Sequence, residues 1–151
     1  MASTRTMVAT CFQNGGAVAL GTFAGVLSLA ATEWASSILH PPPADFGGTE
    51  EEISRHVAKY PAWVLALLGS VGWGGAMVAS TFLATRLNVE RSASYGVGVG
   101  LFFSSAAVLN MNMLPYPRWY WVVEGVTLPL GVYLGVKLGV RNGKENYYQL
   151  L

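Results

Sequence analysis

Residues 62–85 read AWVLALLGSVGWGGAMVASTFLAT, a run without a single ionisable side chain. A helix rises about 1.5 Å per residue, so about 20 apolar residues cross the roughly 30 Å hydrocarbon core of a membrane. This run is long enough and predicts a transmembrane helix. Three further charge-poor stretches surround it, at residues 15–39, 95–114 and 118–140.

The whole composition agrees with this prediction. The chain is 52% hydrophobic and only 11% charged, whereas about a quarter of the residues in soluble proteins are charged. The apolar runs are continuous and lack the alternation of barrel strands, and a helix satisfies its own backbone hydrogen bonds in lipid. We therefore predict an all-α integral membrane protein, a four-helix bundle that forms one domain over residues 1–151.

The one long connection, residues 40–61, follows the first apolar stretch. His40-Pro-Pro-Pro43 is expected to be extended, because each proline fixes its own φ and disfavours helix in the preceding residue. Thr49 and Glu52 then form a capping-box pattern, which predicts a short amphipathic helix over residues 49–59. This helix is either an ordinary ordered element of the loop or a partner-binding one.

Charge predicts the orientation of the bundle. Four spans place both termini and the connection at residues 86–94 on one side, which carries six of the nine lysines and arginines. Basic residues favour the cytoplasmic, matrix or stromal side, so both termini are expected there. The six are Arg5, Arg86, Arg91, Lys137, Arg141 and Lys144, against Arg55, Lys59 and Arg118 on the other side.

The two halves of the chain resemble each other at an offset of 56 residues. Tyr60-Pro-Ala-Trp63 opens the second span and Tyr116-Pro-Arg-Trp119 opens the fourth, and Gly69 falls on Gly125. Proline is tolerated in the first turn of a helix, where no hydrogen bond is lost. We predict a tandem repeat of a two-helix hairpin, with an approximate two-fold axis along the membrane normal.

Small residues recur four apart in every span. Such stripes let helix backbones approach closely, and this packing replaces the hydrophobic drive that lipid does not supply. The bundle is therefore expected to be tight, which disfavours a large central cofactor or a wide pore. The glycines predicted to pack the helices are Gly21, Gly25, Gly72, Gly96, Gly100, Gly131 and Gly135.

Two carboxylates, Glu33 and Glu124, lie inside the predicted spans at a similar depth, about 9 Å below the less basic surface at about 1.5 Å per residue. Asn110 and Asn112 enter the same layer from the third span. Intramembrane carboxylates are costly and mark functional sites. The layer is either a proton or cation site or a set of hydrogen bonds that joins the helices.

Other polar residues support no chemistry of their own. The net charge of +1 gives no basic surface for nucleic acid. Both histidines lie in the outer loop, so haem ligation within the bundle is not expected, and without a ligand spacing they predict no metal site. No nucleophile, phosphate-loop or zinc-protease motif appears, and Cys11 has no partner for a disulfide. We predict neither an enzyme nor a bound cofactor.

The aromatic cluster at positions 116 and 119–121 is typical of an interfacial belt. The C-terminal segment is more suggestive, because apolar and aromatic side chains in a polar terminus gain nothing unless they dock onto another protein. The residues of this predicted docking segment are Tyr147, Tyr148, Leu150 and Leu151.

Several short motifs together resemble a pattern found in small four-helix bacterial membrane proteins of unknown function. The motifs are His40-Pro-Pro-Pro43, a glycine-rich second span that ends at Arg86, Asn110 before Leu114-Pro-Tyr-Pro117, and Trp119-Tyr-Trp121. In those proteins the third motif often reads Leu-Pro-His-Pro, whereas Tyr116 replaces the histidine here. The resemblance implies the four-helix fold and no particular activity.

The leading hypothesis is an accessory subunit of a larger membrane complex, such as one of the respiratory chain, another electron-transport complex or a photosynthetic complex. Residues 1–14 have one basic residue and no acid, as in mitochondrial targeting segments, although a short polar leader looks the same. The mitochondrial inner membrane, the thylakoid and the bacterial inner membrane are all compatible. The alternative is a small transporter or channel component that uses the layer around Glu33 and Glu124. In either case the expected partners are membrane lipids and other subunits.

Overall fold

The computed structural model describes the backbone of residues 4–148 and the side chains of residues 7–140, and this part of the chain is helical without a strand. Four of the segments are long and apolar enough to span a membrane, which confirms the predicted fold class. The elements are α1 Thr4–Leu39, α2 Glu50–Val57, α3 Ala62–Leu67, η1 Leu68–Trp73, α4 Gly74–Leu87, α5 Ala93–Met113 and α6 Arg118–Tyr148.

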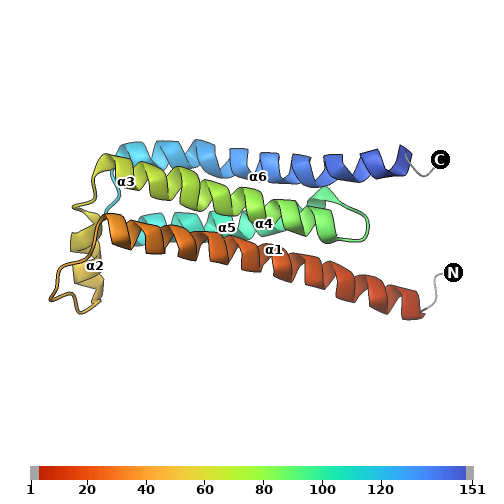
Figure 1. Cartoon of the computed structure of the whole chain (residues 1–151), viewed down its shortest axis with the longest axis horizontal. Coiled ribbons are helices and arrows are strands. Elements are labelled where there is room, and N and C mark those ends of the chain that lie inside the picture. Colours follow the sequence, from red (N-terminus) through yellow and green to blue (C-terminus); the bar gives the residue numbers. More distant parts are fainter. Residues whose placement is uncertain (1–3, 149–151) are drawn as a thin grey trace.

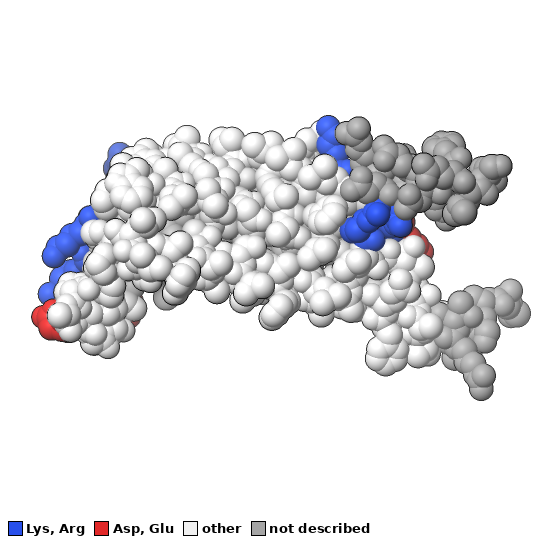
Figure 2. Space-filling model, viewed as in Figure 1, with Lys and Arg blue, Asp and Glu red and all other residues white. Residues whose placement is uncertain are grey.

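The long helices run side by side and alternate in direction, so both ends of the chain lie at one end of the molecule and α2 lies at the other (Figure 1). The second span is built from three consecutive pieces, α3, η1 and α4. Lysine and arginine side chains gather at the two ends, and the surface between them shows no charged residue in this view (Figure 2). This distribution is that of a protein whose middle section faces lipid.

Helix α1 begins at Thr4, not near residue 15 as we predicted, so the segment expected to be a polar leader continues the first span as a helix. The apolar part, Met7–Leu39, has 33 residues and is about 50 Å long at about 1.5 Å per residue. By contrast, α5 has 21 residues, about the thickness of a membrane core. Helix α1 is therefore longer than a bilayer requires.

Asn14 marks the point where α1 passes the α4–α5 connection. Its side-chain amide donates to the Tyr95 hydroxyl at 2.9 Å, and the Val89 backbone N–H donates to its Oδ1 at 3.0 Å. Tyr95 lies in the first turn of α5, and Val89 lies in the α4–α5 connection. Residues 4–13, here called the N-terminal arm, thus extend past the connection, and in Figure 1 this end of α1 diverges from the other helices.

Helix α4 occupies the centre of the bundle and packs against α1, α5 and α6. The predicted glycine stripes make these contacts. A Cβ added to Gly21 would lie 2.6 Å from the Ser80 carbonyl oxygen, and one added to Gly131 would lie 2.7 Å from the Met77 Cβ. Both distances are below those of real Cβ contacts, so the backbones approach as closely as glycine permits.

The other predicted packing glycines have equally close neighbours. Gly25 contacts Phe103, Gly72 contacts Thr32, Gly96 contacts Thr85, Gly100 contacts Val132, and Gly135 contacts Thr81.

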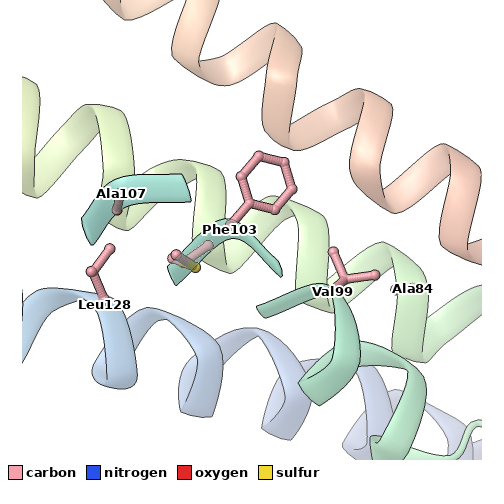
Figure 3. Packing of buried hydrophobic residues seen from close by; sticks show 6 residues of the cluster. Ala84, Val99, Phe103, Ala107 and Leu128 are labelled. Carbon is pink, nitrogen blue, oxygen red and sulfur yellow. The ribbon is translucent and has the colours of Figure 1, made fainter. Parts of the chain in front are cut away.

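Larger apolar side chains fill the remaining space around α4. Phe103 reaches from α5 toward α1 and α4, and Leu128 approaches from α6 (Figure 3). The buried members of this core cluster are Met77, Ala84, Val99, Phe103, Ala107 and Leu128.

The predicted capping box at α2 is present. The Glu52 backbone N–H donates to Thr49 Oγ1 at 3.3 Å, and the Thr49 backbone N–H donates to the Glu52 carboxylate at 3.1 Å. Helix α2 is shorter than predicted and ends at Val57, whose side chain is buried. One face of this helix therefore packs against the protein.

The tandem repeat stays a prediction. Both proposed copies have the same opening, since α3 and α6 each begin directly after a Tyr-Pro pair. The packing of the two copies differs, because α4 contacts three other spans whereas its counterpart α6 packs mainly on α4 and α5. Gly69 is likewise buried while its counterpart Gly125 faces open space.

The π-helical turn η1 in the middle of the second span was not predicted. A π-helix is wider than an α-helix, and single turns of it are often found at functional sites. Three glycines fall in or just after it, at positions 69, 72 and 74. Because glycine has no Cβ, it tolerates this geometry and leaves space on the helix surface.

Candidate functional site

The centre of the candidate site is Glu124, whose side chain on α6 is completely buried. Its carboxylate lies against Gly69 in η1, where an added Cβ would overlap Oε1 and would lie 3.1 Å from the Tyr120 ring. Gly69 and the π-helical turn therefore provide the niche that holds the carboxylate. A residue with a Cβ fits at position 69 only if Glu124 shifts.

Neither oxygen of Glu124 has a hydrogen-bond partner. The nearest polar group is the Tyr120 hydroxyl, one helical turn away on α6, which is buried and interacts with the carboxylate without forming a well-shaped hydrogen bond. A buried, unpaired carboxylate is costly. A group in this state readily holds a proton, because the neutral acid avoids much of that cost.

Glu33 occupies a different environment on α1. Its side chain is exposed and lines an open cavity of about 340 Å³ beneath α2. The cavity lies where the ends of the spans meet the outer loop. Its lining comes from α1, the outer loop, α2, the second span, the C-terminal end of α5 and the α5–α6 connection. Water entering from the outer surface can therefore reach this carboxylate.

Tyr116 lies beside Asn110 and Tyr120. Its hydroxyl donates to Asn110 Oδ1 at 3.2 Å, and its ring stacks on Tyr120 with centroids 4.5 Å apart. Burial raises the pKa of Tyr116, and the negative charges of Glu33 and Glu124 raise it further. The two carboxylates therefore act on one tyrosine, although they lie on different helices.

Of the four residues predicted for the polar layer, Glu33 and Asn110 come together, since both line the same cavity. Glu124 does not line it and is buried beside Gly69 and Tyr120. Asn112 is exposed and donates to the Val108 carbonyl oxygen of its own helix at 2.7 Å. Asn112 therefore faces away from Asn110, because two residues along a helix turn the side chain to another face.

The place of two tyrosines differs from the prediction. Tyr116 and Tyr120 were expected in an interfacial belt, but Tyr120 is fully buried and Tyr116 lines the cavity. One signal was available, since Tyr120 precedes Glu124 by four residues and so shares its helix face. Trp119 and Trp121 are exposed, as a belt requires.

The outer loop forms an aromatic cluster above the cavity. The rings of His40 and His56 stack at 4.9 Å, and Tyr60 contacts both edge-on. Within the described residues, no group of three or more His, Cys, Asp or Glu side chains is placed to hold a metal ion. The two histidines pack with Tyr60 as an aromatic cluster of the loop.

The side chains of the predicted C-terminal docking segment lie outside the described residues. Tyr147 and Tyr148 are the last residues of α6, but their side chains lie outside the described residues, as do Leu150 and Leu151 altogether.

In comparisons with protein families, curated proteins and solved structures, nothing matches this chain.

The geometry bears on both alternatives left open for the polar layer. Hydrogen bonds that join helices through Glu124 are not present among the described residues, since both of its oxygens lack a partner. What remains is one closed carboxylate that can hold a proton and one open carboxylate in a cavity. Toward the opposite side, the glycine contacts of α4 with α1, α5 and α6 close the bundle.

Proposed function

We propose that this protein is an accessory, structural transmembrane subunit of a larger membrane complex. The observation that carries the proposal is the N-terminal arm, residues 4–13, which continues α1 beyond the α4–α5 connection. Met7, Val8 and Phe12 are exposed on it, and Phe12 is 79% exposed. Exposed apolar side chains that extend past the neighbouring connection favour a protein partner.

The closed bundle supports the same function. A helix-packing core built on glycine contacts gives a rigid scaffold with no wide passage, which suits a subunit that stabilises others more than a channel. Respiratory and photosynthetic complexes are the proposed hosts, in the mitochondrial inner membrane, the thylakoid or the bacterial inner membrane. Both termini then face the matrix, stromal or cytoplasmic side.

Native electrophoresis after mild detergent extraction from the source membrane tests the subunit proposal. We expect migration with a larger assembly of other proteins, and we expect Phe12→Ala to release part of the chain from it. Phe102→Ala is the matched control, because this phenylalanine is also exposed but lies on α5, away from the N-terminal arm. Migration of the unaltered protein as a monomer or homo-oligomer would refute the proposal.

The second candidate is a small transporter component, favoured by the unpaired, buried Glu124 behind a cavity that contains Glu33. In this function a proton or cation exchanges between the cavity and the two carboxylates. Proteoliposomes with an internal pH dye test it. Proton flux that Glu33→Gln together with Glu124→Gln abolishes, in a variant that still folds, supports transport, and no flux from the unaltered protein rejects it.

A further inference from the structure

The cavity beneath α2 has the size and lining of a ligand site. Its volume of about 340 Å³ lies within the usual range of small-molecule pockets, about 300–1,000 Å³. Glu33 is the sole acidic residue of its lining, and no lysine or arginine belongs to that lining. The electrostatic character of the cavity is therefore set by one carboxylate.

His56, the histidine of the cavity lining, is uncharged near neutral pH. Burial lowers the pKa of His56, and the neighbouring charges of His40 and Lys59 lower it further. A hydrogen bond to the His40 backbone raises this pKa, but by less than the other causes lower it. His56 therefore adds an aromatic surface to the cavity and no positive charge near pH 7.

Aromatic rings form much of the remaining wall. Phe46 and His56 lie with ring centroids 5.8 Å apart, and His56 and Tyr60 lie 5.1 Å apart, so these three rings form a continuous cluster. Tyr116 also lines the cavity and is held by its hydrogen bond to Asn110 and by its stacking on Tyr120. Rings held in place around a carboxylate are the arrangement that binds quaternary ammonium groups, through cation–π and charge interactions.

We propose that this cavity binds the ammonium group of an organic cation, with Glu33 as the counter-ion and the rings of Phe46, Tyr60 and Tyr116 around it. Two sources carry this chemistry at a membrane surface, the headgroup of a zwitterionic phospholipid and a free alkylammonium compound. The inference depends on neither the subunit nor the transport proposal, because binding requires only the cavity.

The test uses the full chain in nanodiscs of phosphatidylglycerol, a lipid without an ammonium group. Choline is titrated by calorimetry at pH 8, and 3,3-dimethylbutan-1-ol, its uncharged isostere, is titrated in parallel, with empty nanodiscs as the background. We expect saturable binding of choline and none of the alcohol. Glu33→Gln should weaken choline binding about tenfold, because it removes the opposite charge.

Glu51→Gln is the matched control, since Glu51 is an exposed carboxylate of α2 that does not line the cavity, and its binding should equal that of the unaltered protein. Tyr60→Leu, which removes a ring and keeps the charge, should also weaken binding and serves if Glu33→Gln does not fold. No choline binding above background, equal binding of the alcohol, or unchanged binding by the folded Glu33 and Tyr60 variants would overturn the proposal.

A second set of nanodiscs, made with phosphatidylcholine, distinguishes the sources. If the lipid headgroup occupies the cavity, the apparent affinity for choline falls in these nanodiscs relative to phosphatidylglycerol. If the affinity is the same in both lipids, the ligand is a free organic cation. Both results support an ammonium site and differ only in where the ammonium comes from.

Discussion

At the scale of single residues, Gly69 and Glu124 depend on each other. The carboxylate is buried only because the facing residue of η1 has no Cβ. The pairing joins two helices through shape alone, since the carboxylate forms no hydrogen bond. Such a niche is sensitive to added volume, because interiors at native density have no spare room.

We therefore expect Gly69→Ala to destabilise the protein by about 1–3 kcal/mol, the usual cost of overpacking, measured by unfolding in detergent. Gly125→Ala is the matched control, because no atom lies near the position of its added Cβ, and it should lose nothing. The double variant Gly69→Ala, Glu124→Ala should recover much of the loss. If Gly69→Ala is as stable as the unaltered protein, the niche is not closed.

His56 is expected to make the packing of the outer loop depend on pH. Because its pKa is lowered from 6.5, the docked loop binds fewer protons than the detached loop in the range just below that value. The stabilisation is therefore complete above about 6.5 and is lost as the pH falls through the lowered pKa. The groups that act on His56 are His40, Lys59 and the rings of Phe46 and Tyr60.

Hydrogen exchange of residues 40–60, corrected for intrinsic rates, measures this effect. We expect less protection at pH 5 than at pH 7.5, and His56→Gln should reduce the difference. Equal protection at the two pH values in the unaltered protein would show that the packing of the loop does not depend on the protonation of His56.

At the scale of helices, the contact between α4 and α6 is the most glycine-dependent. Gly131, Gly135 and Gly139 are all buried against α4. An added Cβ at Gly135 would overlap Thr81 Oγ1 and lie 3.0 Å from the backbone nitrogen of Phe82. Backbone atoms of a packed helix move aside only if the whole helix shifts, so this stripe sets the distance between the two helices.

Gly135→Ala is accordingly expected to cost about 1–3 kcal/mol of stability, in spite of the higher helix propensity of alanine, which favours it by about 1 kcal/mol. Gly98→Ala on α5 is the control, because its added Cβ meets open space. Thermal unfolding of the two variants in the same detergent compares them. A loss of stability in Gly98→Ala as large as in Gly135→Ala would contradict a role for the stripe.

At the scale of the whole molecule, charge and shape together predict one orientation in the membrane. Cys11 is exposed on the N-terminal arm, and Ala44 is exposed in the outer loop at the opposite end. If the basic side faces the cytoplasm in bacterial expression, a membrane-impermeant maleimide should reach Cys11 only after the cells are permeabilised. In the Cys11→Ser, Ala44→Cys variant it should react with intact spheroplasts. The reverse labelling would show the opposite orientation.

The sequence by itself determined the number of spans, their approximate ends except the start of α1, the capping box of α2 and the glycines that pack the helices. These features depend on local composition and spacing, because lipid forces each apolar segment into a helix whatever its neighbours are. It also identified Glu33, Glu124 and Asn110 as candidate site residues, because polar side chains within an apolar segment can be recognised without a structure.

Only the tertiary structure decided what those residues do. Whether Glu124 forms a hydrogen bond depends on the residue that faces it. This residue is Gly69, which lies in the π-helical turn, far from Glu124 in the sequence. Whether Glu33 is open or closed depends on how α2 folds back over the spans. Helix rotation and the position of the loop are set by packing between distant segments, and no local pattern in the sequence carries that information.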